Sequence, residues 1–208
     1  NFGASDPDLA SLITQAINDA AVLEFDFVPT GDSLTFRFVF ASEEYLEYVN
    51  SINDVFGFFL SGPGINGPYT NNGENIALVP GTTQPVSING VNNVSNPAYY
   101  VDNGTGTTSP QNGSPFYVQF DGFTVVITAY AQVVCGETYH IKLAIGDASD
   151  TILDSGVFIE AGSFQSNAIT LSTDISSGGV DSVLYEGCGQ ADLVMFRAGD
   201  VTLADSVQ

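Results

Sequence analysis

Hydrophobic and polar residues alternate along several short segments of this chain. Residues 22–27 and 34–40 show the clearest period of two, and the turn-forming residues 29–32 separate them. Alternation of this kind puts the apolar side chains on one face of a β-strand. The two segments therefore predict a β-hairpin in which each strand has one buried face.

Other strands are predicted where short apolar runs stand between turn residues. These segments are residues 56–60, 116–120, 123–130, 139–145, 156–161 and 168–171. The dipeptide Asp121-Gly122 predicts a tight hairpin turn between the second and third of them. Residues 9–17 carry apolar side chains at helical spacing after Asp6 and Pro7, an N-cap with proline in the first turn, so one short helix is predicted there.

Composition agrees with many short strands joined by turns. Of the 208 residues, 44% are hydrophobic, and the chain has 22 Gly and 9 Pro, which favours a sandwich. We therefore predict an all-β fold, a jelly-roll-like β-sandwich with a short N-terminal helix, over residues 1–168. Residues 169–208 are predicted to be a linker and the opening strands of a following β-module, with strands expected at residues 183–188 and 193–196. About 40 residues seldom fold unaided, so this segment is too short to be a domain of its own.

The charge balance excludes two classes of partner. Against 24 acidic residues there are 3 basic ones, which gives a formal net charge of -21. Nucleic acid binding requires a basic surface, and an anionic membrane surface would repel this chain. No apolar run reaches the length of a membrane span, so no membrane insertion is expected. The acidic excess itself has two compatible interpretations, solubility in a salty medium and clustering of carboxylates around divalent cations.

Three aspartates between two predicted strands form the strongest candidate site. Asp147, Asp150 and Asp154 follow one another at spacings of three and four residues. Calcium takes six to eight hard oxygen ligands, and such a loop can supply several of them, so calcium is the expected cofactor. The pattern is not an EF-hand, because it lacks that motif's spacing and flanking helices. The alternative is that these aspartates only form turns.

A second acidic group follows the strand predicted at residues 34–40. Glu43 and Glu44 come directly after that strand, and Asp54 directly precedes the next one. Carboxylates at strand ends need solvent or a cation, so we expect these three to share a metal site with the aspartate loop. The alternative is a solvated acidic loop.

Catalytic candidates are few. His140 is the one histidine and lies within a predicted strand, and no nucleophile elbow, zinc-protease motif or Cys/His pairing is present. Two carboxylates such as Glu43 and Asp154 could in principle hydrolyse a polysaccharide, but in so acidic a chain any pair would qualify. No catalytic residue is therefore predicted, and a binding or structural role is favoured.

The long stretch rich in Gly, Asn, Pro and Thr between residues 62 and 115 is the predicted ligand-binding surface. Tyr69, Tyr99 and Tyr100 lie in it, and tyrosines among asparagines suit stacking and hydrogen bonding to a glycan or another surface ligand. Their alternative role is packing. The two cysteines, Cys135 and Cys188, are a candidate disulfide that would tie the trailing segment to the sandwich, or else two separate thiols.

Several motifs in order resemble one known family, the choice-of-anchor L domain. They are LEFDFVP at 23–29, FVFASEEY at 38–45, NDVFGFFLSG at 53–62 and YHIKLAI at 139–145, followed by residues 147–164. The resemblance implies a module of a large secreted or surface-anchored protein of Bacteroidetes-type bacteria. It also implies that the trailing segment opens an immunoglobulin-like module, and it carries no enzymatic assignment.

Taken together, the sequence predicts a calcium-stabilised extracellular module that acts in adhesion or surface filament assembly, with glycan binding as one means. Its expected partners are a glycan or surface ligand and neighbouring β-modules of the same chain or like subunits. One alternative is a purely structural stalk or fibre subunit joined by strand addition. The other is a polysaccharide-degrading enzyme.

Overall fold

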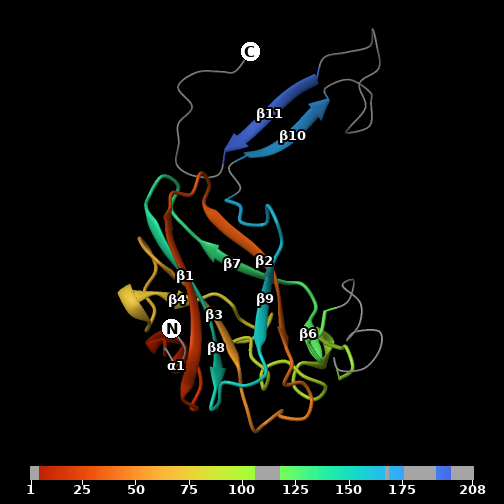
Figure 1. The fold of residues 1–208 in the computed structure, drawn as a ribbon. Helices are drawn as coiled ribbons and strands as arrows, with labels where there is room; N and C mark the ends of the chain where they lie inside the picture. Colours follow the sequence, from red (N-terminus) through yellow and green to blue (C-terminus); the bar gives the residue numbers. More distant parts are fainter. Residues whose placement is uncertain (1–4, 106–117, 167–168, 176–190, 198–208) are drawn as a thin grey trace.

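The computed structural model describes residues 5–105, 118–166, 169–175 and 191–197. Two antiparallel sheets form the body of the molecule (Figure 1). This confirms the prediction of an all-β sandwich with a short N-terminal helix.

The first sheet has four strands in the order β1-β8-β3-β4. Their bounds are β1 Ile17–Phe27, β8 Tyr139–Ala148, β3 Val55–Ser61 and β4 Glu74–Asn75. Strand β8 lies at the centre and pairs with β1 on one side and β3 on the other. Strand β1 is therefore an edge strand of this sheet.

The second sheet is built around β2, Ser33–Ser42. One side of β2 pairs first with β7, Ile127–Gln132, and then with β6, Gly122–Thr124, which itself pairs with β5, Tyr100–Asp102. Strand β9, Ser155–Ile159, pairs with the second half of β2.

The remaining elements are short. They are helix α1, Pro7–Ala10, and the 3-10 turns η1, Thr70–Asn72, and η2, Pro97–Tyr99. Strands β10, Ile169–Ile175, and β11, Ala191–Arg197, form a separate two-stranded antiparallel sheet.

The main core lies between the two sheets and is rich in phenylalanine. Alternate residues of β2 point inward, and Phe36 of β2 meets Phe58 of β3 with ring centroids 4.4 Å apart. One layer along, Phe38 meets Phe56 at 5.1 Å. The first pair is edge-to-face and the second is tilted, and aromatic contacts of these kinds add to the free energy gained from burying the rings. They therefore help to hold the two sheets in register.

A smaller core covers the outer face of the first sheet. Leu9 of α1 packs there with Val55 and Phe59, the outward-facing residues of β3. Lys142 of β8 reaches the same face, where its ammonium contacts both carboxylates of Asp6 and Asp8 at the start of α1. Strand β3 is consequently buried on both faces.

The helix is shorter than the sequence predicts. Residues 9–17 were expected to be helical, but α1 ends at Ala10 and β1 begins at Ile17. The N-cap is as expected, because Asp6 accepts hydrogen bonds from the backbone N–H groups of Asp8 and Leu9. The apolar residues that follow pack onto the outer core without helical backbone, which agrees with the marginal stability of very short helices.

The predicted hairpin of residues 22–27 and 34–40 is wrong. Both segments are strands, but β1 pairs with β8 in one sheet and β2 pairs with β7, β6 and β9 in the other. The turn at 29–32 crosses between the sheets, and Ser166 accepts hydrogen bonds there from the N–H groups of Thr30 and Gly31. Alternation shows that a strand has one buried face. Strands of both sheets face the same core and show the same alternation, so the pattern does not tell which strands pair.

The hairpin predicted at Asp121-Gly122 is also wrong. Residues 118–120 are not a strand, residues 116–117 lie outside the described residues, and the segment predicted at 123–130 is divided into β6 and β7. Gly122 is needed for a different reason, since a Cβ there would lie 2.6 Å from the ring of Tyr100.

The domain boundary at residue 168 and the immunoglobulin-like nature of residues 169–208 stay predictions. Strands β10 and β11 agree with the strands expected near 168–171 and 193–196. The strand expected at 183–188, which contains Cys188, lies outside the described residues.

Candidate functional site

Four strand ends bring the predicted acidic residues together at one end of the sandwich. Strand β2 ends at Ser42, β3 begins at Val55, β8 ends at Ala148 and β9 begins at Ser155. Pairing of β2 with β9 and of β3 with β8 places these ends side by side, at the foot of the molecule in Figure 1. The side chains involved are Glu43, Glu44, Asp54, Asp147, Asp150 and Asp154, which we call the acidic end.

Asp54 is the structural centre of the acidic end. It is fully buried, and its carboxylate accepts hydrogen bonds from the N–H of Ala148 at 2.9 Å and from the hydroxyl of Ser155 at 2.7 Å. Those two partners are the last residue of β8 and the first of β9, so Asp54 fixes both ends of the loop that carries Asp150 and Asp154.

The acidic end concentrates like charge in a buried place, and three carboxyl groups there have raised pKa values. Burial, followed by the nearby charges of Asp54, Asp150 and Asp147, raises the pKa of Glu44 to about 8. Burial and the neighbouring aspartates raise the pKa of Asp147 to about 7. Burial also raises the pKa of Asp54 to about 6, against the lowering effect of its two hydrogen bonds. At neutral pH this end therefore holds protons or a compensating cation.

Glu44 has an unsatisfied oxygen. Its side chain is 1% exposed, and Oε2 has no hydrogen-bond partner among the described residues. Leaving a buried carboxyl oxygen unpaired is costly. The charges of Asp54, Asp150 and Asp147 act on this carboxyl, so the unsatisfied group lies near the other acids.

The outer part of the acidic end is closer to solvent. Asp154 is exposed, and its backbone N–H donates to the Glu43 carboxylate at 3.3 Å, while the N–H of Glu43 donates to the carbonyl of Asp154. Asp150 is half-buried and is held through its carbonyl, which accepts from the Asn18 amide. Among the described residues, no group of three or more Asp, Glu, His or Cys side chains is placed to hold a metal ion.

The sequence did not single out Asp19, Asp102 or Asp121 as site residues. The charge of Asp19 acts on Asp147. Burial, followed by the charges of Glu47, Glu43 and Asp102, raises the pKa of Asp121 to about 6. Asp121 was assigned to a turn, and Asp102 lies in the long loop-rich stretch. Only the pairing of β5 with β6 brings these two together.

The three predicted ligand-binding tyrosines do not form one surface. Tyr69 packs on Phe59 at the outer core of the first sheet, with ring centroids 4.8 Å apart. Tyr99 is the last residue of η2, and Tyr100 is the first residue of β5 in the second sheet. Tyr100 packs on Tyr45 with ring centroids 5.0 Å apart, and its hydroxyl is buried. These contacts agree with the packing alternative, and the ligand-binding role stays a prediction.

His140 and Cys135 lie away from the acidic end. The Nδ1 atom of His140 is 2.8 Å from the carboxylate of Asp26 on the neighbouring strand, an exposed cross-strand pair. Cys135 is half-buried beside the Gly136 turn, and its candidate partner Cys188 lies outside the described residues, so the disulfide stays a prediction.

Fold and site together define a β-sandwich module whose acidic loops gather at one end. The profile of the family described as the Choice-of-anchor L domain matches residues 1–165, and the chain belongs to this family. No curated protein and no solved structure matches the chain.

Membership makes this chain a module of a surface-associated or secreted protein, in a family of non-catalytic surface modules. Within the described part of the chain, no helix is long and apolar enough to cross a bilayer.

Proposed function

We propose that this chain is a calcium-stabilised extracellular module of a bacterial cell-surface protein, acting in adhesion or surface filament assembly. The observation that supports the proposal is the buried Glu44 carboxyl with its unsatisfied oxygen, which lies near Asp54, Asp147 and Asp150 at the acidic end.

Calcium suits this end because of its ligand chemistry. It binds carboxylate, carbonyl and water oxygens in flexible arrangements of six to eight. Glu44, Asp54 and Asp147 supply buried carboxyl oxygens, and Asp150 and Asp154 supply more exposed ones. Magnesium demands a nearly ideal octahedron and gives up its waters reluctantly, so the larger ion fits an irregular loop better.

Binding requires a local adjustment. Among the described residues, no group of three acidic side chains is placed to hold a metal ion. In the calcium-bound form the side chains of Asp150 and Asp154 therefore rotate inward, and waters fill the remaining positions. The cation then offsets the like-charge repulsion, and the loop between β8 and β9 becomes rigid. In this loop the non-glycine residues Ser149 and Leu153 have positive φ angles of 81° and 70°. This backbone conformation is unfavourable for such residues, and a cation bound by the loop would stabilise it.

Thermal melting with and without chelator tests the proposal. A cation that binds only the folded chain stabilises it by about 2.7 kcal/mol at a hundred times its Kd, which for a domain of this size is a rise in Tm of roughly 5–10 °C. We expect that rise with millimolar calcium and a much smaller one with sodium chloride at equal ionic strength. Equal shifts with both salts would mean charge screening alone.

Substitutions locate the site. Asp150→Ala together with Asp154→Ala removes two ligands that are not buried, so the fold is retained while the calcium-dependent shift is lost. Glu137→Ala is the matched control, because Glu137 is exposed and follows the Gly136 turn at the opposite end of β8. A full calcium shift in the double variant contradicts the assignment.

The edge strand β1 favours a second candidate function, a structural subunit of a stalk or fibre joined by strand addition. Val22 and Leu23 of β1 are 47% and 56% exposed, which is unusual for apolar residues of a long strand. They line an apolar groove of about 240 Å³ together with Val157 and Ile159 of β9. An added strand would pair with the β1 edge and cover this groove.

A further inference from the structure

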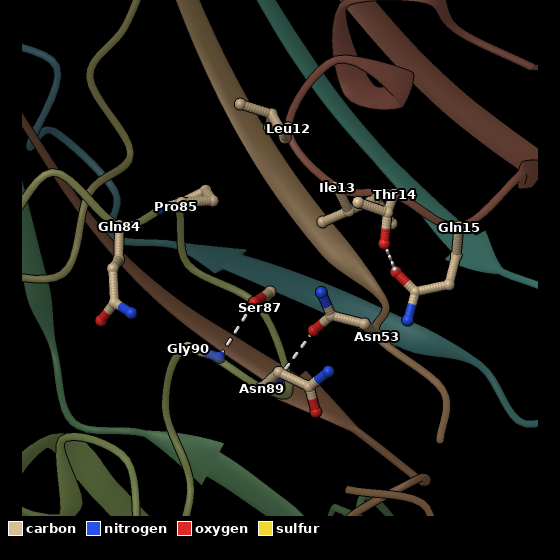
Figure 2. Close-up of a pocket in the computed structure, with 10 residues that line it drawn as sticks. All are labelled: Leu12, Ile13, Thr14, Gln15, Asn53, Gln84, Pro85, Ser87, Asn89 and Gly90. Carbon is tan, nitrogen blue, oxygen red and sulfur yellow. Dashed lines mark hydrogen bonds between the residues drawn. The ribbon is translucent and has the colours of Figure 1, made fainter. Parts of the chain in front are cut away.

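A separate pocket lies beside the acidic end, where Ser87 pairs with Val55 at the start of β3. Residues 12–15 form one wall, the loop 84–90 forms the other, and Asn53 lies between them (Figure 2). Its volume of about 320 Å³ is at the lower end of the range for small-molecule sites, roughly 300–1,000 Å³. None of the three tyrosines nominated from the sequence lines it.

The lining of this pocket is uncharged. In a chain with a net charge of -21, its polar side chains are instead the amides of Gln15, Asn53, Gln84 and Asn89 and the hydroxyls of Thr14 and Ser87. A pocket that held a cation would need carboxylates, and one that held an anion would need basic groups. The lining therefore suits a neutral, polar ligand.

The amide orientations make the pocket rich in hydrogen-bond donors. The Oδ1 of Asn53 accepts from the N–H of Asn89 at 2.8 Å, and the Oδ1 of Asn89 accepts from the N–H of Asn50 at 2.6 Å. Because a backbone N–H can only donate, these contacts fix which end of each amide is oxygen. Among the described residues, neither amide nitrogen donates to a protein acceptor, so both remain available to a ligand.

In the two glutamines, which lie nearer the solvent, the side-chain oxygen is likewise the atom that accepts a hydrogen bond from the protein. The Oε1 of Gln84 accepts from the Asn96 amide at 3.0 Å, and the Oε1 of Gln15 accepts from the Thr14 hydroxyl at 3.3 Å. Leu12, Ile13 and Pro85 add apolar surface between these polar groups. A ring with many oxygen acceptors and apolar C–H faces matches both features, and this is the chemistry of a sugar.

Hydrogen bonds connect both walls of the pocket to the acidic end. The N–H of Ile88 donates to the carbonyl of Asp54, the residue next to Asn53. On the other wall, the carbonyl of Ala16 accepts from the N–H of Ser149, in the aspartate loop. Ordering of the acidic end thus fixes the distance between the walls.

We propose that this pocket binds a neutral carbohydrate, and that cation binding at the acidic end sets its shape. The inference rests on the proposed adhesive function and names its ligand class. Neutral sugars are selected over acidic ones, because the carboxylates beside the pocket repel an anionic sugar.

Titration calorimetry or saturation-transfer NMR in millimolar calcium tests the proposal. The neutral probes are cellotriose, maltotriose, mannotriose and tri-N-acetylchitotriose, and the acidic probes are trigalacturonate and 3′-sialyllactose. We expect binding of at least one neutral probe and of neither acidic one. Binding of acidic probes alone, or of no probe, overturns the assignment.

Variants show whether binding occurs in this pocket. Gln15→Ala combined with Gln84→Ala removes two donors from half-buried or exposed positions, and we expect roughly tenfold weaker binding with an unchanged melting temperature. Gln132→Ala on the exposed face of β7 is the matched control and keeps full affinity. Equal affinity in the pocket variant and the control overturns the location.

The calcium and sugar measurements separate the two proposals. Sugar binding without a chelator-sensitive Tm supports the pocket and contradicts the calcium site. A calcium shift without binding of any neutral sugar overturns the pocket and leaves the calcium site in place. If both are correct, chelation lowers sugar affinity in the unchanged chain.

Discussion

Lys142 shows how one residue organises the outer core. Its side chain is 8% exposed, and its ammonium lies 5.0 Å from the ring centre of Phe59 and contacts Asp6 and Asp8. Burial lowers the pKa of this lysine, but its bonds to the two carboxylates outweigh burial, so the pKa lies above its usual value. This charge cluster attaches α1 to β8.

Replacing the lysine tests the importance of the cluster. Lys142→Met keeps the apolar stem but leaves two buried carboxylates without a cation, and breaking such a pair costs about 3–5 kcal/mol. We expect the free energy of unfolding in urea to fall by that amount. Adding Asp8→Asn to Lys142→Met recovers part of the loss, because it removes one unpaired charge. Equal stability of Lys142→Met and the wild-type chain would contradict a structural role.

The same cluster predicts loss of stability in acid. Burial raises the pKa of Asp8, but hydrogen bonds from Lys142 and Thr70 outweigh it, so the folded-state pKa lies below the ordinary value of 3.8. A carboxyl with a lowered pKa stabilises the fold above its unfolded pKa, and this contribution is lost as pH falls through the folded value. Urea unfolding between pH 5 and about pH 2 should therefore show a smaller loss in Asp8→Asn than in the wild-type chain.

Sequence reasoning found the acidic end but not the lysine cluster. The acidic residues were identifiable because each lies at the end of a recognisable strand, and the strand ends of a sandwich gather at its two ends. These residues are Glu43, Glu44, Asp54 and the aspartate loop. Lys142 and Asp6 are 136 positions apart, and no local pattern links a lysine in a strand to a distant helix cap. The amides of the pocket were missed for the same reason, since they come from three separate segments.

At the level of elements, alternation identified the strands better than their partners. Strands β2, β3 and β8 lie close to their predicted positions, because short apolar runs with one or two buried faces are typical of strands in a sandwich. The pairing of β1 with β8 depends on a crossing between sheets that the turn residues do not encode. The helix was overestimated because Leu12 and Ile13 serve the outer core in non-helical backbone.

The exposed edge of β1 permits a test of strand addition. Leu23→Lys places a charge in the apolar groove beside that edge, and a lysine on an edge strand opposes pairing with another chain. If chains assemble through this edge, sedimentation velocity will show assemblies of the wild-type chain and monomers of the variant. Thr128→Lys on the exposed face of β7 is the control and leaves assembly unchanged. Assemblies that persist in Leu23→Lys exclude this edge as the contact.

For the whole molecule, the dominant property is self-repulsion. The chain carries 24 acidic residues and 3 basic ones, so its folded form concentrates negative charge that the unfolded chain spreads out. Raising sodium chloride from about 10 mM to about 150 mM shortens the screening length from about 30 Å to about 8 Å. We expect Tm to rise by a few degrees over this range, equally in the wild-type chain and in Asp150→Ala/Asp154→Ala. A Tm independent of the sodium chloride concentration would contradict the view that self-repulsion destabilises the folded chain.

The placement of the three basic residues has a practical consequence for handling the protein. Arg37 and Lys142 lie inside the paired strands β2 and β8, and Arg197 is the last residue of β11. Trypsin requires an extended, accessible bond, so it leaves the folded sandwich intact. The one lysine is buried, and its ammonium is paired with Asp6 and Asp8, so amine-reactive reagents modify it slowly while the chain is folded. The rate of this modification therefore reports how often the outer core opens.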